Sequence, residues 1–220
     1  RSGMFNWIAN EMLKMTKGNP KYILISLAFF TAIVSAFLDN VTTVILIMPV
    51  TFVIAKELDI NPIPFLITEI LASNIGGTAT LIGDPPNIII GSAAGLSFMD
   101  FIKELTGIVA AILIVNVGLL TFIFRKQLVA AKEKMEKVAQ LDNSHTITDK
   151  ALMIRSGIIL LLVIIGFMLH DITHIQTCVT AMAGAAFLLL FEKPQKIFNE
   201  VEWNTIFFFI GLFIIIGGLE

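Results

Sequence analysis

The chain has 220 residues, of which 56% are hydrophobic and only 15% are charged, and its formal net charge is −2. Soluble globular proteins carry about 25% charged residues. Here the charges are missing over blocks long enough to cross a membrane, and the mean hydropathy is +0.89. The negative charge and the lack of a basic stripe argue against a nucleic-acid partner, and a single cysteine, Cys178, excludes a disulfide framework. The composition predicts an all-α, polytopic membrane protein with the lipid bilayer as a partner.

Two short apolar segments flank a polar stretch near the start of the chain. They run over 22–38 and 44–55, with the polar stretch at 39–43. Helical arms of this size measure about 20–26 Å, less than the ~30 Å of the hydrocarbon core. We therefore predict a re-entrant helical hairpin over 22–55, whose tip is surrounded by protein or by a water-filled cavity. Two ordinary spans joined by a polar turn at the far surface are the alternative.

Residues 63–94 predict a transmembrane helix that is broken within the membrane. The interruption is Gly-Asp-Pro-Pro-Asn at 83–87, where two consecutive prolines remove two amide donors and the glycine lowers helix propensity. A short amphipathic segment at 97–105 follows, and then a span at 106–124. Three further spans are predicted near 152–169, 175–191 and 203–219.

Basic residues set the predicted orientation. Residues 125–155 hold seven Lys and Arg, and four more lysines flank the hairpin: Lys14, Lys17, Lys21 and Lys56. The positive-inside bias places both groups in the cytoplasm. The polar stretch at 125–150 is therefore predicted to be a cytoplasmic linker.

The hairpin tip supplies the first candidate binding residues. A carboxylate at membrane depth, such as Asp39, costs several kcal/mol unless it is paired, protonated or facing a polar cavity. Asn40, Thr42 and Thr43 add neutral oxygens that suit a cation or hydrogen-bond an anion. Two alternatives stay open: Asp39 is solvated at the headgroups, or the two threonines merely cap the second arm.

The break supplies the second set of candidates. Broken helices direct helix N-termini at anions and unwound carbonyls at cations, and here Asp84 adds a carboxylate. Packing and kinking alone are the alternative reason for the glycines and prolines. Glu69, inside the same predicted helix, is either a proton-carrying group or the partner of a lysine from another helix.

Residues 36–91 carry three motifs in order: FLDNVTT at the tip, SNIGGTAT, and GDPPN at the break. Together with VEWNTIFFFIGLF at 201–213, they resemble the ion transporter superfamily. The resemblance is nearest to the branch of ArsB/NhaD-type permeases and the melanosomal P protein, with citrate and dicarboxylate carriers as relatives.

The resemblance implies two inverted repeats, each with a re-entrant hairpin and a broken helix, that move as an elevator against a scaffold. Residues 1–124 would be part of the transport domain, beginning with an amphipathic helix, and 151–220 the start of the second repeat. The second hairpin and break are not in this sequence, so we expect the chain to be a piece of a longer protein, with the missing repeat as its partner. A homodimer is left open.

The resemblance also implies a cation site between the tip and the break, with Na⁺ at Asp39, Asn40, Asp84 and Asn87. Beyond a bound Na⁺, we expect no cofactor. The full set of predicted ion- or substrate-binding residues is Asp39, Asn40, Thr42, Thr43, Ser73, Asn74, Thr78, Gly83, Asp84, Pro85, Pro86 and Asn87.

The functional hypothesis is a secondary active transporter in the cell inner or plasma membrane, working by alternating access and coupled to Na⁺ or H⁺. Its substrate would be a small ion or anion of the arsenite, Na⁺/H⁺ or carboxylate class. A channel or a non-transporting membrane subunit is the alternative. The sequence has no nucleophile triad, phosphate-binding glycine loop or zinc signature, so we predict no enzyme activity.

Overall fold

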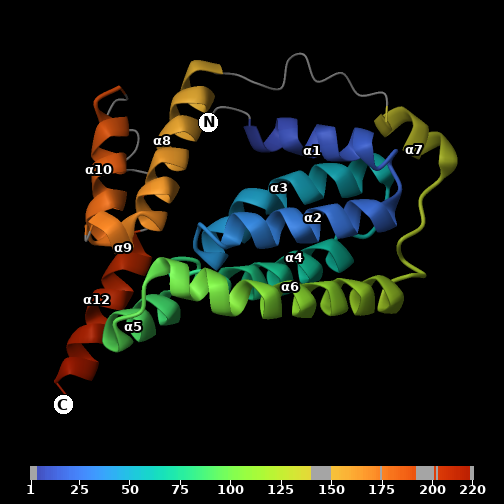
Figure 1. Ribbon diagram of the computed structural model, residues 1–220. Helices are drawn as coiled ribbons and strands as arrows, with labels where there is room; N and C mark the ends of the chain where they lie inside the picture. The colour runs from blue at the N-terminus through green and yellow to red at the C-terminus, as the bar shows by residue number, and fades with distance from the viewer. Residues whose placement is uncertain (1–3, 140–149, 174, 192–200, 202, 219–220) are drawn as a thin grey trace.

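The computed structural model describes residues 4–139, 150–173, 175–191, 201 and 203–218. Every regular element in these ranges is a helix (Figure 1). Three helices are long and apolar enough to cross a membrane: α3 (Asn40–Leu58), α6 (Phe98–Ile123) and α8 (Lys150–Met168). The prediction of an all-α, polytopic membrane protein is confirmed.

The predicted hairpin consists of α2 (Pro20–Ser35) and α3. α2 begins at a proline, and the Asn19 side chain before it accepts a hydrogen bond from the Lys21 amide at 3.0 Å. The chain then turns and enters α3 directly after Asp39. Most of the polar stretch predicted as the tip therefore lies in the first turn of α3 rather than in a loop.

The second arm of the hairpin is longer than predicted. α3 has 19 residues and ends where Asp59 adopts a left-handed conformation, with φ of 53°. Its length is about 28 Å, so the prediction of two arms too short to span is wrong for α3. The difference arises at both ends: the polar residues after Asp39 form the first turn of α3, and Lys56 and Glu57 lie in its last turn with their side chains exposed.

The predicted broken helix consists of α4 (Ile63–Gly77) and α5 (Pro85–Ala94), separated by an unwound segment at 78–84. The break thus precedes the two prolines instead of containing them. Pro85 and Pro86 occupy the first two positions of α5, where a helix has no partner for the amide hydrogen that proline lacks.

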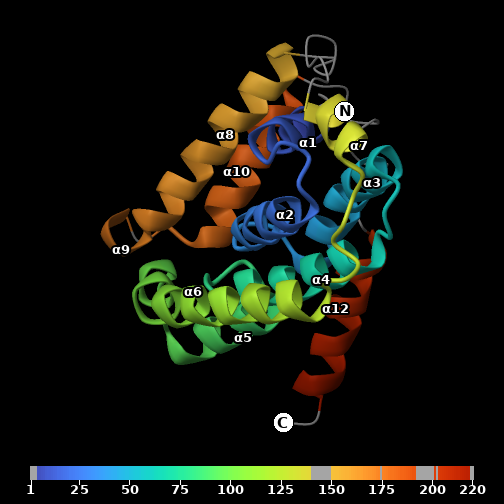
Figure 2. The same ribbon diagram turned by 90° about the vertical axis from the view of Figure 1, so that its right-hand side faces the viewer.

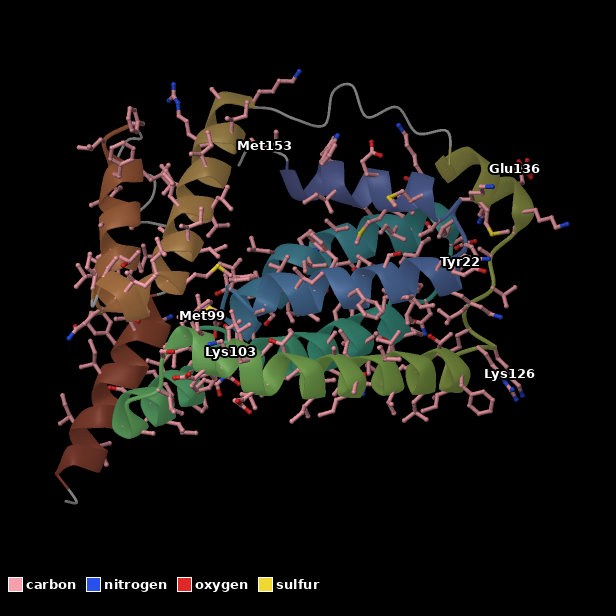
Figure 3. The ribbon with its side chains drawn as sticks, in the orientation of Figure 1. Tyr22, Met99, Lys103, Lys126, Glu136 and Met153 are labelled. Carbon is pink, nitrogen blue, oxygen red and sulfur yellow. The ribbon has the colours of Figure 1, made fainter. Side chains whose placement is uncertain are left out.

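α6 is one continuous helix of 26 residues, so the predicted division into an amphipathic segment and a separate span is wrong. A capping box starts it: the Ser97 hydroxyl accepts from the Asp100 amide at 3.2 Å, and the Asp100 carboxylate accepts from the Ser97 amide at 2.8 Å. The single glycine at the expected boundary, Gly107, lowers helix stability by about 1 kcal/mol but does not end a helix. Figure 3 shows Lys103 and Lys126 toward opposite ends of α6, and residues 105–124 between them carry no charge.

Small residues bring α2 and α4 into close contact. A Cβ atom at Gly76 would overlap the backbone of Ala32, so only glycine allows this approach. α6 closes the group through Leu113 and Val117, which pack with Ala28 and Ala32 of α2 and Ala72 of α4. In Figure 1 the helices α2, α3, α4 and α6 form one layered bundle.

Two short helices pack on this bundle, one alongside α2 and α3 and one at their end (Figure 1). They are α1 (Met4–Met15) and α7 (Lys132–Ala139), the latter from the predicted linker. Leu13 of α1, Leu58 at the end of α3 and Leu128 before α7 are all buried in one cluster there. The stretch after α6 therefore packs against the hairpin base over part of its length.

The second half of the described chain contains α8, α9 (His170–Thr173), α10 (Thr177–Leu189) and α12 (Trp203–Gly217). α8 and α10 pair with each other, and Figure 2 shows them on one side of α2 with α6 on the other. The rings of Phe98 and Phe167, 5.6 Å apart, join α6 to α8.

Candidate ion-binding site between the hairpin tip and the helix break

A cavity of about 670 Å³ lies where the hairpin tip meets the helix break. Its wall combines the first residues of α3, one face of α4, the start of α5 and two residues of α12. Seven of the predicted site residues line it: Asp39, Asn40, Ser73, Asn74, Asp84, Pro85 and Pro86. The fold thus brings together residues that are up to 47 positions apart in sequence, from 39 to 86.

At the tip, the Asp39 carboxylate caps the helix that follows it. Its Oδ2 atom accepts hydrogen bonds from the Val41 and Thr42 amides, both at 3.1 Å, and from the Thr42 hydroxyl at 3.3 Å. A side chain that accepts from the amides of a first turn satisfies donors that have no partner within the helix. Asp39 is half-buried and at the cavity wall, so it is both a cap and a lining residue.

Asn40 links the tip to the break. Its Oδ1 atom accepts from the Ser35 hydroxyl at 2.7 Å, and its side chain also hydrogen-bonds to the Asp84 carboxylate. Gly77 makes room for this side chain, because a Cβ atom there would overlap Asn40 Oδ1. The end of α2, the start of α3 and the break are therefore joined through one amide group.

At the break, two side chains hold the unwound segment in place. The Thr80 hydroxyl donates to the carbonyl oxygen of Ala36 at the tip and accepts from the Gly83 amide at 3.1 Å. Asn87, in the first turn of α5, donates from Nδ2 to the carbonyl of Thr80 at 2.9 Å and, at longer range, to the carbonyls of Gly77 and Thr78. These bonds satisfy backbone groups that unwinding would otherwise leave unpaired.

The Asp84 carboxylate differs from that of Asp39. Asp84 precedes α5 in extended conformation, with φ of −144° and ψ of 133°, and makes no capping hydrogen bond to its own helix. Its described hydrogen-bond partner is Asn40 of the hairpin tip. The Asp39 carboxylate lies close enough for the two negative charges to repel each other. Two carboxylates of like charge therefore share one cavity, an arrangement that favours a bound cation or proton.

At both helix N-termini beside the cavity, several first-turn amides are missing or already bonded within the chain. In α3 the Val41 and Thr42 amides bond to the Asp39 side chain, and the Thr43 amide donates to the Asp39 carbonyl at 2.9 Å. In α5 the first two residues are prolines, and the Asn87 amide donates to the Asp84 carbonyl at 3.0 Å. The electrostatics at this part of the cavity suit a cation better than an anion.

The remaining predicted residues lie outside the cavity wall. Gly83 is buried at the contact between break and tip, where a Cβ atom would lie 2.8 Å from the Ser35 carbonyl oxygen. Thr43 is fully buried in α3, its hydroxyl without a hydrogen-bond partner. Thr78 is exposed, and its hydroxyl donates to the Asn74 carbonyl at 2.9 Å. Thr42 and Asn87 shape the site through the bonds given above.

Several residues at the site were missed by the sequence analysis. Ser35 and Thr80 tie the tip to the break, yet each is a single hydroxyl residue beside apolar sequence, a weak signal. Asn204 and Phe208 of α12 line the cavity from the other half of the chain. The 201–213 motif contained both residues, but nothing in the sequence placed them beside the tip.

The tip and the break lie against the interior of α6 rather than its end. Ala36 at the tip, Ala79 in the break and Val109 of α6 form one buried cluster. From Val109, α6 continues for about 16 Å toward Phe98. Among the residues that the structure describes, no group of three or more His, Cys, Asp or Glu side chains stands together as a metal site.

Known proteins similar to this chain include several that are named as transporters. A model of the citrate transporter family (CitMHS) matches residues 1–220. The chain is 42% identical to a 46 kDa membrane protein of Mycobacterium leprae, over 100% of this chain and 52% of that protein. It is 42% identical to an uncharacterized transporter of Mycobacterium bovis, over 100% of this chain and 51% of that protein. It is 27% identical to P protein of Sus scrofa, over 99% of this chain and 35% of that protein. The chain spans about half the length of the mycobacterial relatives.

Proposed function

We propose that this chain is half of a secondary active transporter for a small ion or anion. The chain belongs to the citrate transporter family, whose model matches it over residues 1–220. The substrate class is arsenite, Na⁺/H⁺ or carboxylate, and movement is coupled to Na⁺ or H⁺ by alternating access. Binding of the coupling ion would favour the conformation that carries it across, as differential affinity for two states requires. The chain's place in a family of membrane transporters is the ground for this proposal.

The observation that carries it is the pairing of Asp39 and Asp84 on one cavity, joined through Asn40. One carboxylate belongs to the hairpin tip and the other to the helix break, so a cation between them would bind both elements at once. Loss of that cation would leave two like charges facing each other in a site of low polarity, which is unfavourable. The ion would therefore stabilise one arrangement of tip and break.

The two carboxylates take different parts in the proposal. Asp84 makes no bond to its own helix and is the primary ligand or proton carrier. Asp39 is already bound to two amides and contributes charge, with the oxygens of Asn40, Ser73 and Asn74 nearby. In other transporters built from discontinuous helices, unwound backbone carbonyls coordinate Na⁺. Carboxylate and amide oxygens are also ligands that hard cations prefer. Asn87 would act by holding the unwound carbonyls rather than as a direct ligand.

The position of the tip supports a re-entrant hairpin. Ala36 packs beside Val109 in the interior of α6, which extends well beyond it. α3 is long enough to span, so the proposal rests on this packing and not on arm length. The repeat organisation, with 1–124 in the transport domain and 151–220 beginning a second repeat, stays part of the proposal, as does elevator movement.

The orientation proposed from basic residues agrees with the arrangement of the bundle. Tyr22, beside Lys21 at the start of α2, and Lys126 after α6 lie toward the same end in Figure 3. That end would face the cytoplasm in the cell inner or plasma membrane, together with the 125–150 linker. The second repeat would complete the binding centre in the full-length protein, alone or in a homodimer.

The test is flux through the full-length protein in proteoliposomes, with citrate, arsenite and Na⁺ as separate substrates under imposed Na⁺ or pH gradients. The variant Asp84→Asn should abolish gradient-driven flux while membrane insertion and thermal stability stay near wild type. Glu57→Gln, an exposed carboxylate at the far end of α3, is the matched control and should transport normally.

Normal gradient-driven flux in Asp84→Asn would contradict the assignment of the site. Flux far above transporter turnover and independent of any second gradient would point to a channel. No flux of any substrate in the wild type would point to a non-transporting subunit.

A further inference from the structure

A second carboxyl group lies deep in the bundle, away from the Asp39–Asp84 pair. Glu69 of α4 is fully buried, with an exposed fraction of 0%. One of its oxygens, Oε1, accepts a hydrogen bond from the Thr51 hydroxyl of α3, and the other, Oε2, is buried without a partner. The mechanism proposed above does not use it.

No positive charge compensates Glu69 in the described part of the chain. On α3 the charged residues Lys56 and Glu57 are exposed near the far end of the helix. On α6 the charges Asp100, Lys103 and Glu104 are exposed and lie at the first turns. On α2 the titratable residues Lys21 and Tyr22 are exposed at its start, and the next charge along the chain is Asp39. The described part of the structure therefore offers Glu69 no lysine partner. Of the two roles suggested by its sequence position, the pairing with a lysine has no support there.

An ionised carboxylate is not stable in such a place. It would lose its hydration, face no counter-ion and gain only one hydrogen bond from a neutral hydroxyl. A protonated carboxyl group fits better, because it is neutral and its acceptor oxygen still binds Thr51. The geometry thus suits the proton-loaded form of Glu69.

Glu69 is also within reach of the cavity. Ser73 lies one helical turn further along α4, on the same face, which places it about 5–6 Å from Glu69 between Cβ atoms. Ser73 is itself buried and lines the cavity. On this face of α4, one helical turn separates the position of Glu69 from the cavity wall at Ser73.

We propose that Glu69 is a proton-binding site of the transport cycle, loaded in the conformation described here and emptied to the cavity past Ser73. On release, the carboxyl O–H bond breaks, the proton passes to water and the carboxylate keeps the electron pair. The inference deepens the proposed function, on which it rests, by naming the residue that would carry H⁺ where H⁺ is the coupling ion. It places the proton on a residue distinct from the Asp39–Asp84 pair.

The first experiment measures protonation directly and does not depend on transport. Infrared spectra of the full-length protein in lipid are recorded at neutral pH for the wild type, Glu69→Gln and the exposed-carboxylate control Glu57→Gln. The difference spectrum of wild type minus Glu69→Gln should contain the C=O stretching band of a protonated carboxyl group, and that of wild type minus Glu57→Gln should not. Thr51→Val should shift the same band, because it removes the hydrogen bond to Oε1. A difference spectrum of wild type minus Glu69→Gln without such a band would overturn the proposal.

The second experiment separates a transport role from a merely structural buried acid. Uptake of radiolabelled citrate and arsenite into proteoliposomes is measured with and without a pH gradient. Glu69→Gln should lose the acceleration by the gradient but keep exchange of the same substrate between the two sides, and Glu69→Asp should restore part of the acceleration. Equal acceleration in wild type and Glu69→Gln would overturn the coupling role.

The outcomes also separate this inference from the proposed function. Wild-type uptake driven by Na⁺ alone and indifferent to pH would overturn the role of Glu69 and leave the transporter proposal standing. No uptake under any gradient would overturn the transporter proposal and the coupling role with it. The infrared band would then still decide whether Glu69 holds a proton.

Discussion

The hairpin tip and the helix break carry the same local pattern, an aspartate immediately before a helix, and use it differently. Asp39 bonds to the first amides of α3, whereas Asp84 makes no such bond to α5 and instead interacts with Asn40 of the tip. The difference follows from the next two residues. Val41 and Thr42 have amides to cap, while Pro85 and Pro86 have none. A pair of prolines thus leaves a carboxylate at a helix start available to a ligand.

The two regions also depend on each other for their shape. The break has little regular structure of its own, and its backbone is held by Thr80 and Asn87 and by close contact with the tip at Gly77 and Gly83. The tip, in contrast, is built from two helix ends and a helix cap. We therefore expect the break to be the more sensitive of the two to substitution.

Substitution of Gly83 should have the largest effect. In Gly83→Ala the added Cβ would lie 2.8 Å from both the Ser35 carbonyl oxygen and the Gly77 Cα atom, and it would overlap the Gly77 carbonyl oxygen. Overpacking of this kind costs about 1–3 kcal/mol, so the thermal midpoint of the purified protein should fall. Gly107→Ala is the control, since nothing lies within 4 Å of its Cβ position. It should leave the midpoint unchanged or raise it, because alanine favours helix over glycine. Equal midpoints for the two variants would show that tip and break are not in fixed contact.

Removal of the Thr80 hydroxyl should come next. Thr80→Val keeps the shape of the side chain but leaves the Ala36 carbonyl and the Gly83 amide without this partner. Buried polar groups that lose a partner cost about 1–3 kcal/mol. Thermal unfolding measures the loss, and Thr78→Val is the control because its exposed hydroxyl bonds only within its own helix. If Thr80→Val were no less stable than Thr78→Val, the hydroxyl would not be what joins break to tip.

Substitutions at Asp39 should separate its two roles. Asp39→Ala removes the cap of α3 and should cost about 1 kcal/mol, whereas Asp39→Asn keeps a capping oxygen and should cost little. At Asp84 no capping bond is lost, because that side chain makes none to its own helix. Asp84→Asn can keep the hydrogen bond with Asn40 and Asp84→Ala removes it, so any difference between these two variants should disappear when Asn40 is also replaced by alanine. Thermal unfolding of the variants makes the comparison. A loss for Asp84→Ala relative to Asp84→Asn that persists in the Asn40→Ala background would mean that Asp84 supports its helix after all.

The smallest effect on stability is expected from the ion pair of Asp59, an exposed carboxylate at the other end of α3. Its carboxylate pairs with Lys134 of α7 at 2.6 Å, and the hydrogen bond from Lys134, followed by its charge, lowers the pKa of Asp59. Because the pKa in the folded state is the lower one, the pair stabilises the fold above the unfolded-state pKa, and that stability is lost as the pH falls through the folded-state pKa.

Lys134→Gln should therefore lower the thermal midpoint slightly at neutral pH and low salt. The difference should vanish in acid and shrink in high salt, as for other exposed ion pairs. A difference that persists in acid would mean that Lys134 contributes by packing and not by charge.

The class of the protein and the two places where its helices are interrupted follow from the sequence alone. Repeated uncharged apolar blocks of spanning length are typical of transmembrane helices, and tandem prolines cannot continue a helix, so neither conclusion needs tertiary contacts. The helix limits, in contrast, depend on tertiary contacts. α3 began at Asn40 and α6 ran without a break through Gly107, because neighbouring helices stabilise turns that local propensity leaves ambiguous.

Which polar residues meet at the site follows from the packing of the helices and not from the sequence. Ser35, Thr80 and Asn204 reach the site from three different elements, and no periodicity in the sequence records such contacts. The packing also distinguished Asp39 from Asp84, because the bonds that a carboxylate makes depend on which donors its surroundings present. For the same reason Glu69, ambiguous in sequence, is seen to be buried beside Thr51 without a counter-charge in the described part of the chain.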